Sequence, residues 1–218
     1  MNRDNKVFRM IFCALMVAVA TVLSVIKIYR LPFGGSVTAF SMLPILIVGY
    51  AFGPGWGLAT GLVHGIIQLV FGAVNQAFAS QSVGAVIGIM CLDYLVAFTV
   101  LGLSGVFRKA FKTIPGGMAV GSAFAMLLRF LSSFLSGTIF FGQWAEWYFT
   151  QEEFPQRLGS TVLEKFSGTG LAMIYSAIYN AMYMIPEIVG TVVVILIITN
   201  IKPIKEFLKP AEKECNRL

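Results

Sequence analysis

This sequence is poor in charge. Asp, Glu, Lys and Arg make up 12% of its 218 residues, whereas hydrophobic residues make up 57% and the mean hydropathy is +0.82. A soluble domain of this size does not need so much apolar surface, so the composition indicates an integral membrane protein. The net charge of +6 is typical of basic loops beside anionic lipid headgroups, and it does not indicate nucleic-acid binding.

Residues that carry enzyme chemistry are also scarce. His64 is the only histidine, and it is more typical of a neutral core residue than of a metal ligand. The three cysteines, Cys13, Cys91 and Cys215, do not have the spacing of a metal site. The sequence contains neither a Gly-x-Ser-x-Gly elbow nor a Gly-x-x-x-x-Gly-Lys-Ser/Thr loop. We therefore expect no enzyme, no metal and no cofactor, and any ATP must be used by another subunit.

Long apolar runs take up most of the chain. A helix needs about 20 apolar residues to cross a bilayer, which predicts an all-α, polytopic bundle of six transmembrane helices. The predicted spans are 8–26, 37–52, 57–73, 83–104, 118–142 and 171–200. The second and third are short, and four or five true spans remain an alternative. We expect one domain over residues 1–200 and a charged cytoplasmic tail over 201–218.

The basic residues predict the orientation, because Lys and Arg concentrate on the cytoplasmic side of a membrane protein. With six spans and the N-terminus inside, eleven lie inside and four outside. The inner set is Arg3, Lys6, Arg9, Arg108, Lys109, Lys112, Lys202, Lys205, Lys209, Lys213 and Arg217, and the outer set is Lys27, Arg30, Arg157 and Lys165. Both termini are therefore predicted to be cytoplasmic.

Three ionisable residues lie near the middle of three hydrophobic stretches: Asp93, Arg129 and Glu187. A charge at bilayer depth costs roughly 3 kcal/mol, so such residues usually face a cavity, a partner or a ligand. Arg129 and Glu187 lie at similar depth, and we predict that they form a buried ion pair. Asp93 then keeps a negative charge that a small cationic ligand would balance.

Polar and aromatic residues recur at helical spacing around these charges. Ser133 and Trp144 belong to such a stripe in the fifth span, Tyr175 and Tyr179 to one in the sixth with Asn180 on its flank, and Tyr94 adjoins Asp93. Rings that stack and a few polar groups that orient are typical of a pocket for a flat polar ligand. In the first span, Ala14 and Ala18 are four residues apart, which is a weak indication of a face that docks another helix.

The sequence resembles a known family at several segments. These are GGSV (34–37) with Pro44 behind it, LDYLVAF (92–98), LGLSG (101–105), LRF (128–130), SGTIFFG (136–142) and IYSAIYNAMYMIP (174–186). Together they resemble the ThiT/YuaJ family, the thiamine-specific substrate-binding (S) components of energy-coupling factor (ECF) transporters. The resemblance implies a six-helix protein of the plasma membrane that captures thiamine from outside the cell. It implies as partners a membrane scaffold subunit and two ATPase subunits.

The resemblance also implies roles for individual residues. By position it places the acidic residue of the family's pocket at Asp93, followed by Tyr94. It places the pocket's remaining side chains at Tyr175, Asn180 and Phe141, a lid around Gly35, and the family's docking motif at Ala14 and Ala18. Ser133 stands where the family usually has histidine. This departure leaves open an S component or a stand-alone carrier for a thiamine precursor or another small organic cation.

Overall fold

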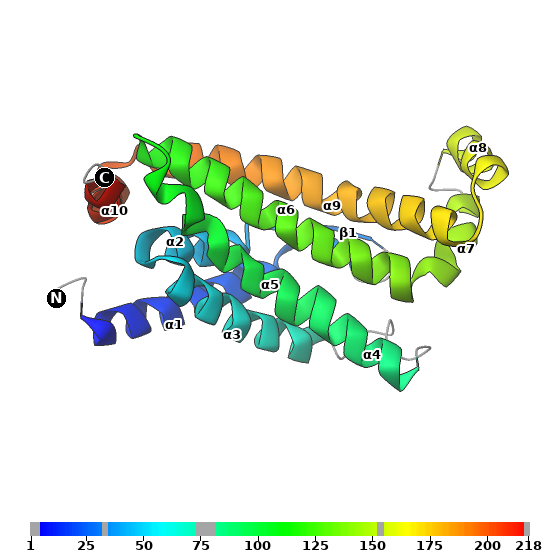
Figure 1. The fold of residues 1–218 in the computed structure, drawn as a ribbon, viewed down its shortest axis with the longest axis horizontal. Helices are drawn as coiled ribbons and strands as arrows, with labels where there is room; N and C mark the ends of the chain where they lie inside the picture. The colour runs from blue at the N-terminus through cyan, green and yellow to red at the C-terminus, as the bar shows by residue number, and fades with distance from the viewer. Residues whose placement is uncertain (1–4, 32–34, 73–81, 152–154, 216–218) are drawn as a thin grey trace.

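The computed structural model describes residues 5–31, 35–72, 82–151 and 155–215. Helices run roughly along one long axis, and the first and last helices lie at the same end of the molecule (Figure 1). Within the described residues, five helical segments are long and apolar enough to cross a membrane. They are α1 (Lys6–Val25), α3 (Pro54–Gly72), the continuous segment Val83–Lys109, α6 (Ile114–Phe140) and α9 (Gly168–Ile198). The predicted polytopic, helical architecture is therefore confirmed.

The sixth helix, α2 (Leu43–Phe52), is shorter than predicted. Its ten residues rise about 15 Å, half the thickness of a bilayer core. Pro44 in its first turn favours a helix start there, and most of its residues are buried against the other helices. The left-handed backbone of Gly53 (φ 90°) then turns the chain directly into α3. The predicted span 37–52 is thus wrong in its first residues.

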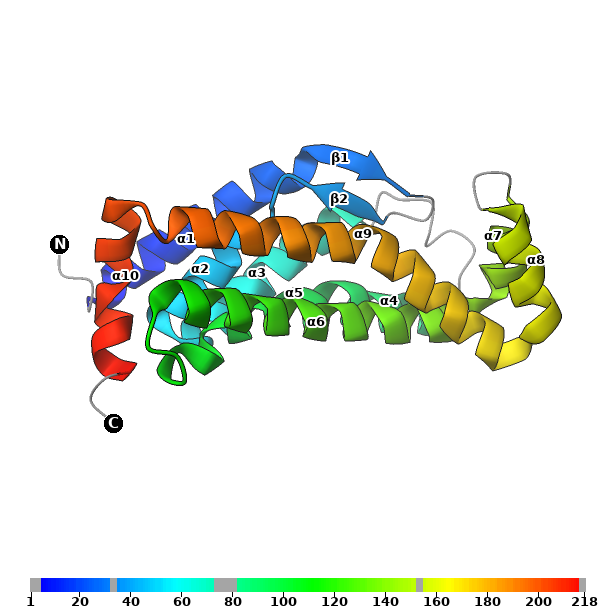
Figure 2. The ribbon, with the colours of Figure 1, turned by 90° about the horizontal axis from the view of Figure 1, so that it is seen from above.

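Those first residues belong to a two-stranded antiparallel hairpin. It is made of β1 (Lys27–Arg30) and β2 (Ser36–Thr38), and it lies along α9 (Figure 2). The β-branched residues Val37 and Thr38 favour an extended backbone. Phe40 follows with a φ of 58°, a left-handed conformation that bulky side chains rarely adopt. The hairpin and this turn therefore replace the outer half of the predicted second span.

The segment Val83–Lys109 changes its helical type along its length. The α-helix α4 (Val83–Ile89) passes into a π-helical stretch, η3 (Met90–Val96), then into α5 (Ala97–Thr99) and a 3-10 stretch, η4 (Val100–Lys109). Ser82 caps its start by accepting a hydrogen bond from the backbone N–H of Ala85. The inner part packs backbone to backbone on α3, because Gly102 lies directly against Gly57.

Short helices close both ends of the bundle. At one end, the turn η5 (Gly142–Trp144) leads into α7 (Ala145–Thr150) and α8 (Gln156–Lys165), and we expect this end to face outward (Figure 1). At the other end, which we expect to be cytoplasmic, α10 (Lys202–Cys215) lies across the bundle (Figure 2). Its Phe207 ring stacks on Phe12 of α1 with ring centroids 5.1 Å apart, so the predicted tail begins as a packed helix.

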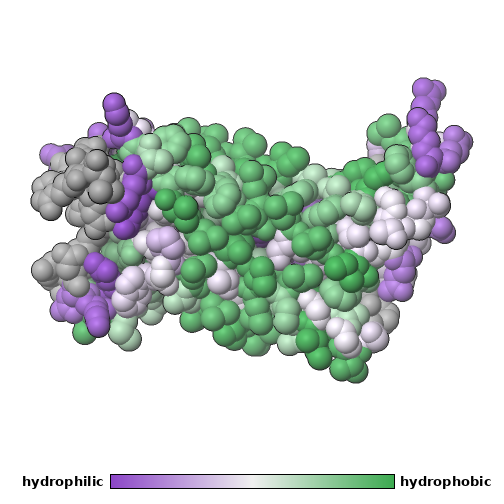
Figure 3. Space-filling model, in the orientation of Figure 1, coloured by the Kyte–Doolittle hydropathy of each residue, from purple (hydrophilic) through white to green (hydrophobic). Residues whose placement is uncertain are grey.

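The surface agrees with a membrane location. Hydrophobic side chains cover the middle of the molecule, and hydrophilic side chains gather at its two ends (Figure 3). Large apolar residues such as Val22, Leu131 and Val189 are exposed on this belt. An apolar surface this extensive requires lipid or a partner to cover it.

Candidate functional site

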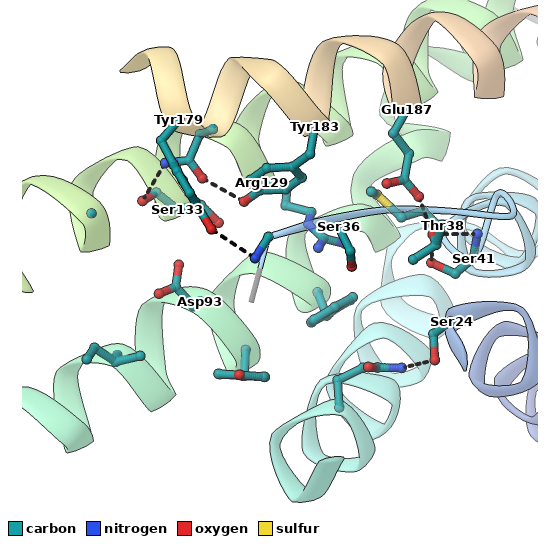
Figure 4. A pocket seen from close by; sticks show the side chains of 18 of the residues that line it. Ser24, Ser36, Thr38, Ser41, Asp93, Arg129, Ser133, Tyr179, Tyr183 and Glu187 are labelled. Atoms are coloured by element: carbon teal, nitrogen blue, oxygen red, sulfur yellow. Dashed lines mark hydrogen bonds between the residues drawn. The ribbon is translucent and has the colours of Figure 1, made fainter. Parts of the chain in front are cut away.

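A cavity of about 200 Å³ lies between the hairpin, the middle of Val83–Lys109, α6 and α9 (Figure 4). Of the nine residues predicted from the sequence to bind a ligand, the structure brings eight together in its wall. They are Gly35, Asp93, Tyr94, Ser133, Phe141, Tyr175, Tyr179 and Asn180. The ninth, Trp144, is not part of this wall. Its ring packs edge-on against Trp147 in the outer cap, with centroids 6.4 Å apart.

The π-helical stretch η3 carries Asp93 and Tyr94 into the cavity wall. π-Helical turns are rare and often mark functional sites, because the extra residue per turn changes the direction of the side chains. Here a neighbouring helix fixes the stretch: the Ser132 hydroxyl of α6 donates to the carbonyl of Leu92 over 2.6 Å. The Ser136 hydroxyl, one turn further along α6, donates to Asp93 Oδ2 over 2.6 Å. Within the described chain no basic group forms an ion pair with this carboxylate.

A buried polar network joins α6 to α9 beside Asp93. The Asn180 amide donates to the carbonyls of Ser176 (2.9 Å) and Ser133 (3.4 Å), and the Tyr183 hydroxyl donates to Asn180 Oδ1 over 2.6 Å. Because its amide hydrogens and oxygen are engaged, the side chain of Asn180 is held in one orientation. Gly137 lies against Ser176 on the same contact, which lets the two helices approach closely.

Tyrosine rings form the outer wall of the cavity. Tyr175, Tyr179 and Tyr183 follow one another along α9 with centroids 5.8 and 6.1 Å apart. Tyr148 of α7 packs on the first two, with centroid distances of 5.1 and 6.0 Å. Burial raises the pKa of the Tyr148 phenol, so it stays neutral at physiological pH. This outer cap therefore supports the rings from behind.

The predicted ion pair between Arg129 and Glu187 is not formed. Glu187 instead accepts a hydrogen bond from Thr38 Oγ1 over 2.5 Å. The Arg129 guanidinium lies over the Phe98 ring, 4.1 Å from its centroid, and its Nε and Nη1 have no hydrogen-bond partner within the described chain. The hairpin brings Thr38 into contact with the Glu187 carboxylate, although the two residues are 149 positions apart in sequence. The depth of Glu187 in its helix could not indicate this partner.

Several wall residues were not predicted. Gln68 of α3 donates to Ser24 Oγ of α1 over 2.7 Å, and both line the cavity. Lys27, also in the wall, is exposed on β1, so water screens its charge. The formal charges of Asp93, Glu187 and Arg129 in the same wall sum to one negative charge. Polar residues in apolar spans were a usable signal for Ser24 and Gln68. Thr38 and Ser41 were missed because their segment was predicted to be a membrane-spanning helix, and Ser36, just before that span, was not proposed as a ligand residue.

The predicted docking residues lie away from the cavity. Ala14 and Ala18 are on the exposed face of α1, whereas Cys13, Val17, Ala20 and Ser24 face the bundle. The predicted core histidine, His64, is fully buried, with Nδ1 3.5 Å from Thr21 Oγ1 and Nε2 3.4 Å from Gln68 Nε2.

A helical membrane bundle with a polar and aromatic cavity between its helices is typical of a solute-binding membrane protein. Comparisons with known proteins narrow this class. The family model described as thiamine transporter protein (Thia_YuaJ) matches residues 10–147. The thiamine transporter ThiT of Bacillus subtilis (strain 168) is 31% identical over 209 residues, covering 91% of this chain and 93% of that protein. The chain belongs to the thiamine transporter (Thia_YuaJ) family, whose function is transport and not catalysis.

A solved structure supports the fold. The structure of ThiT from Listeria monocytogenes superposes with a TM-score of 0.64, covering 93% of this chain and 98% of that chain. Their sequences are 16% identical, so this likeness concerns the arrangement of the helices alone. The fold is thus shared although most side chains differ.

Proposed function

We propose that this chain is the substrate-binding subunit of an ECF-type uptake system and captures thiamine outside the cell. The proposal rests on its family membership and on one feature of the site. Asp93 presents a carboxylate to the cavity, where serine hydroxyls of α6 hydrogen-bond it and no basic group of the described chain forms an ion pair with it. A buried charge without a partner is unfavourable, so a cationic ligand would relieve it.

The chemistry of thiamine suits this wall. Its aminopyrimidine can donate a charge-assisted hydrogen bond to Asp93, which is about twice as strong as a neutral one. Its thiazolium carries a fixed positive charge, and contact with a desolvated tyrosine ring is worth up to about 2 kcal/mol. Tyr175 and Tyr179 supply such rings, and Asn180 and Ser133 supply the neutral polar groups nearby.

The partners follow from what the chain does not contain. No phosphate-binding loop occurs in the sequence, so ATP-driven uptake needs separate ATPase subunits and a membrane scaffold. The exposed alanines of α1, Ala14 and Ala18, leave room for a helix of that scaffold to approach closely. The excess of basic residues at the end that holds α10 supports a cytoplasmic location for both termini and a cavity that faces outward.

Isothermal titration of the detergent-purified protein tests the ligand. Thiamine, thiamine monophosphate, thiamine pyrophosphate and the separate pyrimidine and thiazole halves are titrated in turn. We expect thiamine to bind more tightly than either half by at least about a hundredfold, because linking the two groups removes the entropy loss of one binding event. Equal or tighter binding of one half would assign the site to a precursor, and no heat with any of them would refute the proposal.

A further inference from the structure

The segment between Gly35 and Ser41 crosses the cavity and is fastened to α9 at two points. At the outer point, the backbone N–H of Gly35 donates to the Tyr179 hydroxyl over 3.0 Å. At the inner point, Thr38 Oγ1 donates to Glu187 Oε1 over 2.5 Å (Figure 4). The two α9 residues are eight positions apart, about 12 Å along the helix axis. The segment is therefore held at both ends of the cavity by one helix.

The two points differ in what surrounds them. Tyr179 belongs to the ring wall that a ligand would touch, so a ligand at that wall can compete for its hydroxyl. Glu187 and Thr38 are 3% and 9% exposed, and the Ser41 hydroxyl lies 2.7 Å from Thr38 Oγ1 in the same cluster. This inner cluster is therefore nearly closed to water.

We propose that Glu187 is a positioning residue: it anchors Thr38 and thereby sets the register at which the segment covers the cavity. Glu187 does not form the ion pair expected from the sequence, because the Arg129 guanidinium lies over the Phe98 ring instead. A buried carboxylate that contacts a distant segment through a hydroxyl fixes that segment, because an unpaired carboxylate at this depth is strongly unfavourable. Losing the anchor frees the inner end and lets Gly35 move away from Tyr179.

Cysteine labelling tests the anchor without any ligand. Ser36 lies in β2 between the two points. The variant Ser36→Cys is made in a protein without the three native cysteines. The rate at which it reacts with a membrane-impermeant maleimide is measured in the purified protein. Thr38→Val and Glu187→Leu should each speed the labelling by about tenfold, because each removes a hydrogen bond to a charged acceptor. The double variant should be no faster than either single variant, since both remove the same contact.

Two further variants separate anchoring from general loosening. Thr191→Val is the matched control: Thr191 lies one turn from Glu187 on α9, is fully buried, and its hydroxyl has no partner in the described chain, so labelling should stay at the parent rate. Glu187→Gln keeps an oxygen that accepts from Thr38 and should show a smaller increase than Glu187→Leu. Parent-like labelling in both Thr38→Val and Glu187→Leu, or equally fast labelling in Thr191→Val, would overturn the proposal.

The effect on ligand release rests on the proposed function. Thiamine bound to the parent protein should dissociate about tenfold more slowly than from Thr38→Val, whose side chain keeps nearly the same shape. If the parent binds no thiamine, the proposed function fails while the labelling still decides the anchor. If thiamine binds and leaves both proteins at one rate, the anchor does not control release.

Discussion

Asp93 and Glu187 are both carboxylates in the cavity wall, yet their surroundings separate their roles. Asp93 accepts a hydrogen bond from the Ser136 hydroxyl of the neighbouring helix and lines the cavity. The Glu187 carboxylate accepts a hydrogen bond from Thr38, which belongs to a segment far away in sequence. We therefore propose that carboxylates serve ligand capture at Asp93 and chain positioning at Glu187.

Replacing Asp93 by Asn tests the first role. The substitution keeps the shape but removes the charge, so we expect thiamine affinity to fall by at least about tenfold, the loss of a charge-assisted hydrogen bond. Titration calorimetry measures it. Glu146→Gln, which removes an exposed acid from α7 outside the cavity, is the control and should bind like the parent. Unchanged affinity in Asp93→Asn would remove Asp93 from the site.

Tyr175 offers a second residue-level prediction. Its ring is 1% exposed and packs between Tyr148 and Tyr179, so Tyr175→Ala removes a stacking face and leaves a void. We expect thiamine binding to weaken by about tenfold or more. Tyr175→Phe keeps the ring and should lose less. If the two variants bind equally well, the ring contributes nothing and the tyrosine wall is only packing.

At the level of elements, α1 has two faces with separate tasks. Its inner face reaches the cavity through Ser24, whereas Ala14 and Ala18 lie on the face that the bundle leaves open. Small residues on an exposed membrane face permit close helix contact. The helix that contributes Ser24 to the cavity wall thus also carries the exposed face on which we propose that a partner docks.

Bulky residues at this open face should separate binding from uptake. Ala14→Trp combined with Ala18→Trp should abolish thiamine uptake in cells while purified protein binds thiamine as before, because the cavity is untouched. Uptake of radiolabelled thiamine by cells measures transport, and titration calorimetry of the purified protein measures binding. Cys91→Leu adds bulk at another exposed position of the apolar belt and should transport normally. Normal uptake by the tryptophan variant would place the docking face elsewhere.

At the scale of the whole molecule, the cavity is lined by residues of α1, the hairpin segment, α3, Val83–Lys109, α6 and α9, so no single helix pair forms it. Binding at such a site should stabilise the entire bundle, since a ligand held only by the folded state adds RT ln(1 + [L]/Kd) to the free energy of unfolding. At a thiamine concentration of one hundred times Kd, this amounts to about 2.7 kcal/mol.

Reconstitution tests whether the chain transports by itself. We expect liposomes holding this protein alone to bind thiamine without accumulating it, because the chain contains no site for ATP. Adding the scaffold and ATPase subunits with ATP should start uptake. Accumulation by the single chain under an ion gradient would instead identify a stand-alone carrier.

The sequence alone determined the membrane class, the five long helices and most of the cavity wall. Apolar length sets a membrane span locally, and polar residues inside such spans have few places to lie other than an interior cavity. Asp93, Tyr175 and Asn180 could be placed in the wall for this reason. The resemblance in the sequence also pointed to the family.

Only the tertiary structure decided the hairpin, the π-helical turn at Asp93 and the partner of Glu187. Val37 and Thr38 read as the start of an apolar span, and their extended conformation depends on contacts with α9. The Arg129–Glu187 pair was expected because the position of a residue along a span indicates its depth in the membrane. The direction in which its side chain points depends on how the helix packs, which the sequence does not give. Contacts such as Gly35–Tyr179, 144 residues apart, exist only once the helices are assembled.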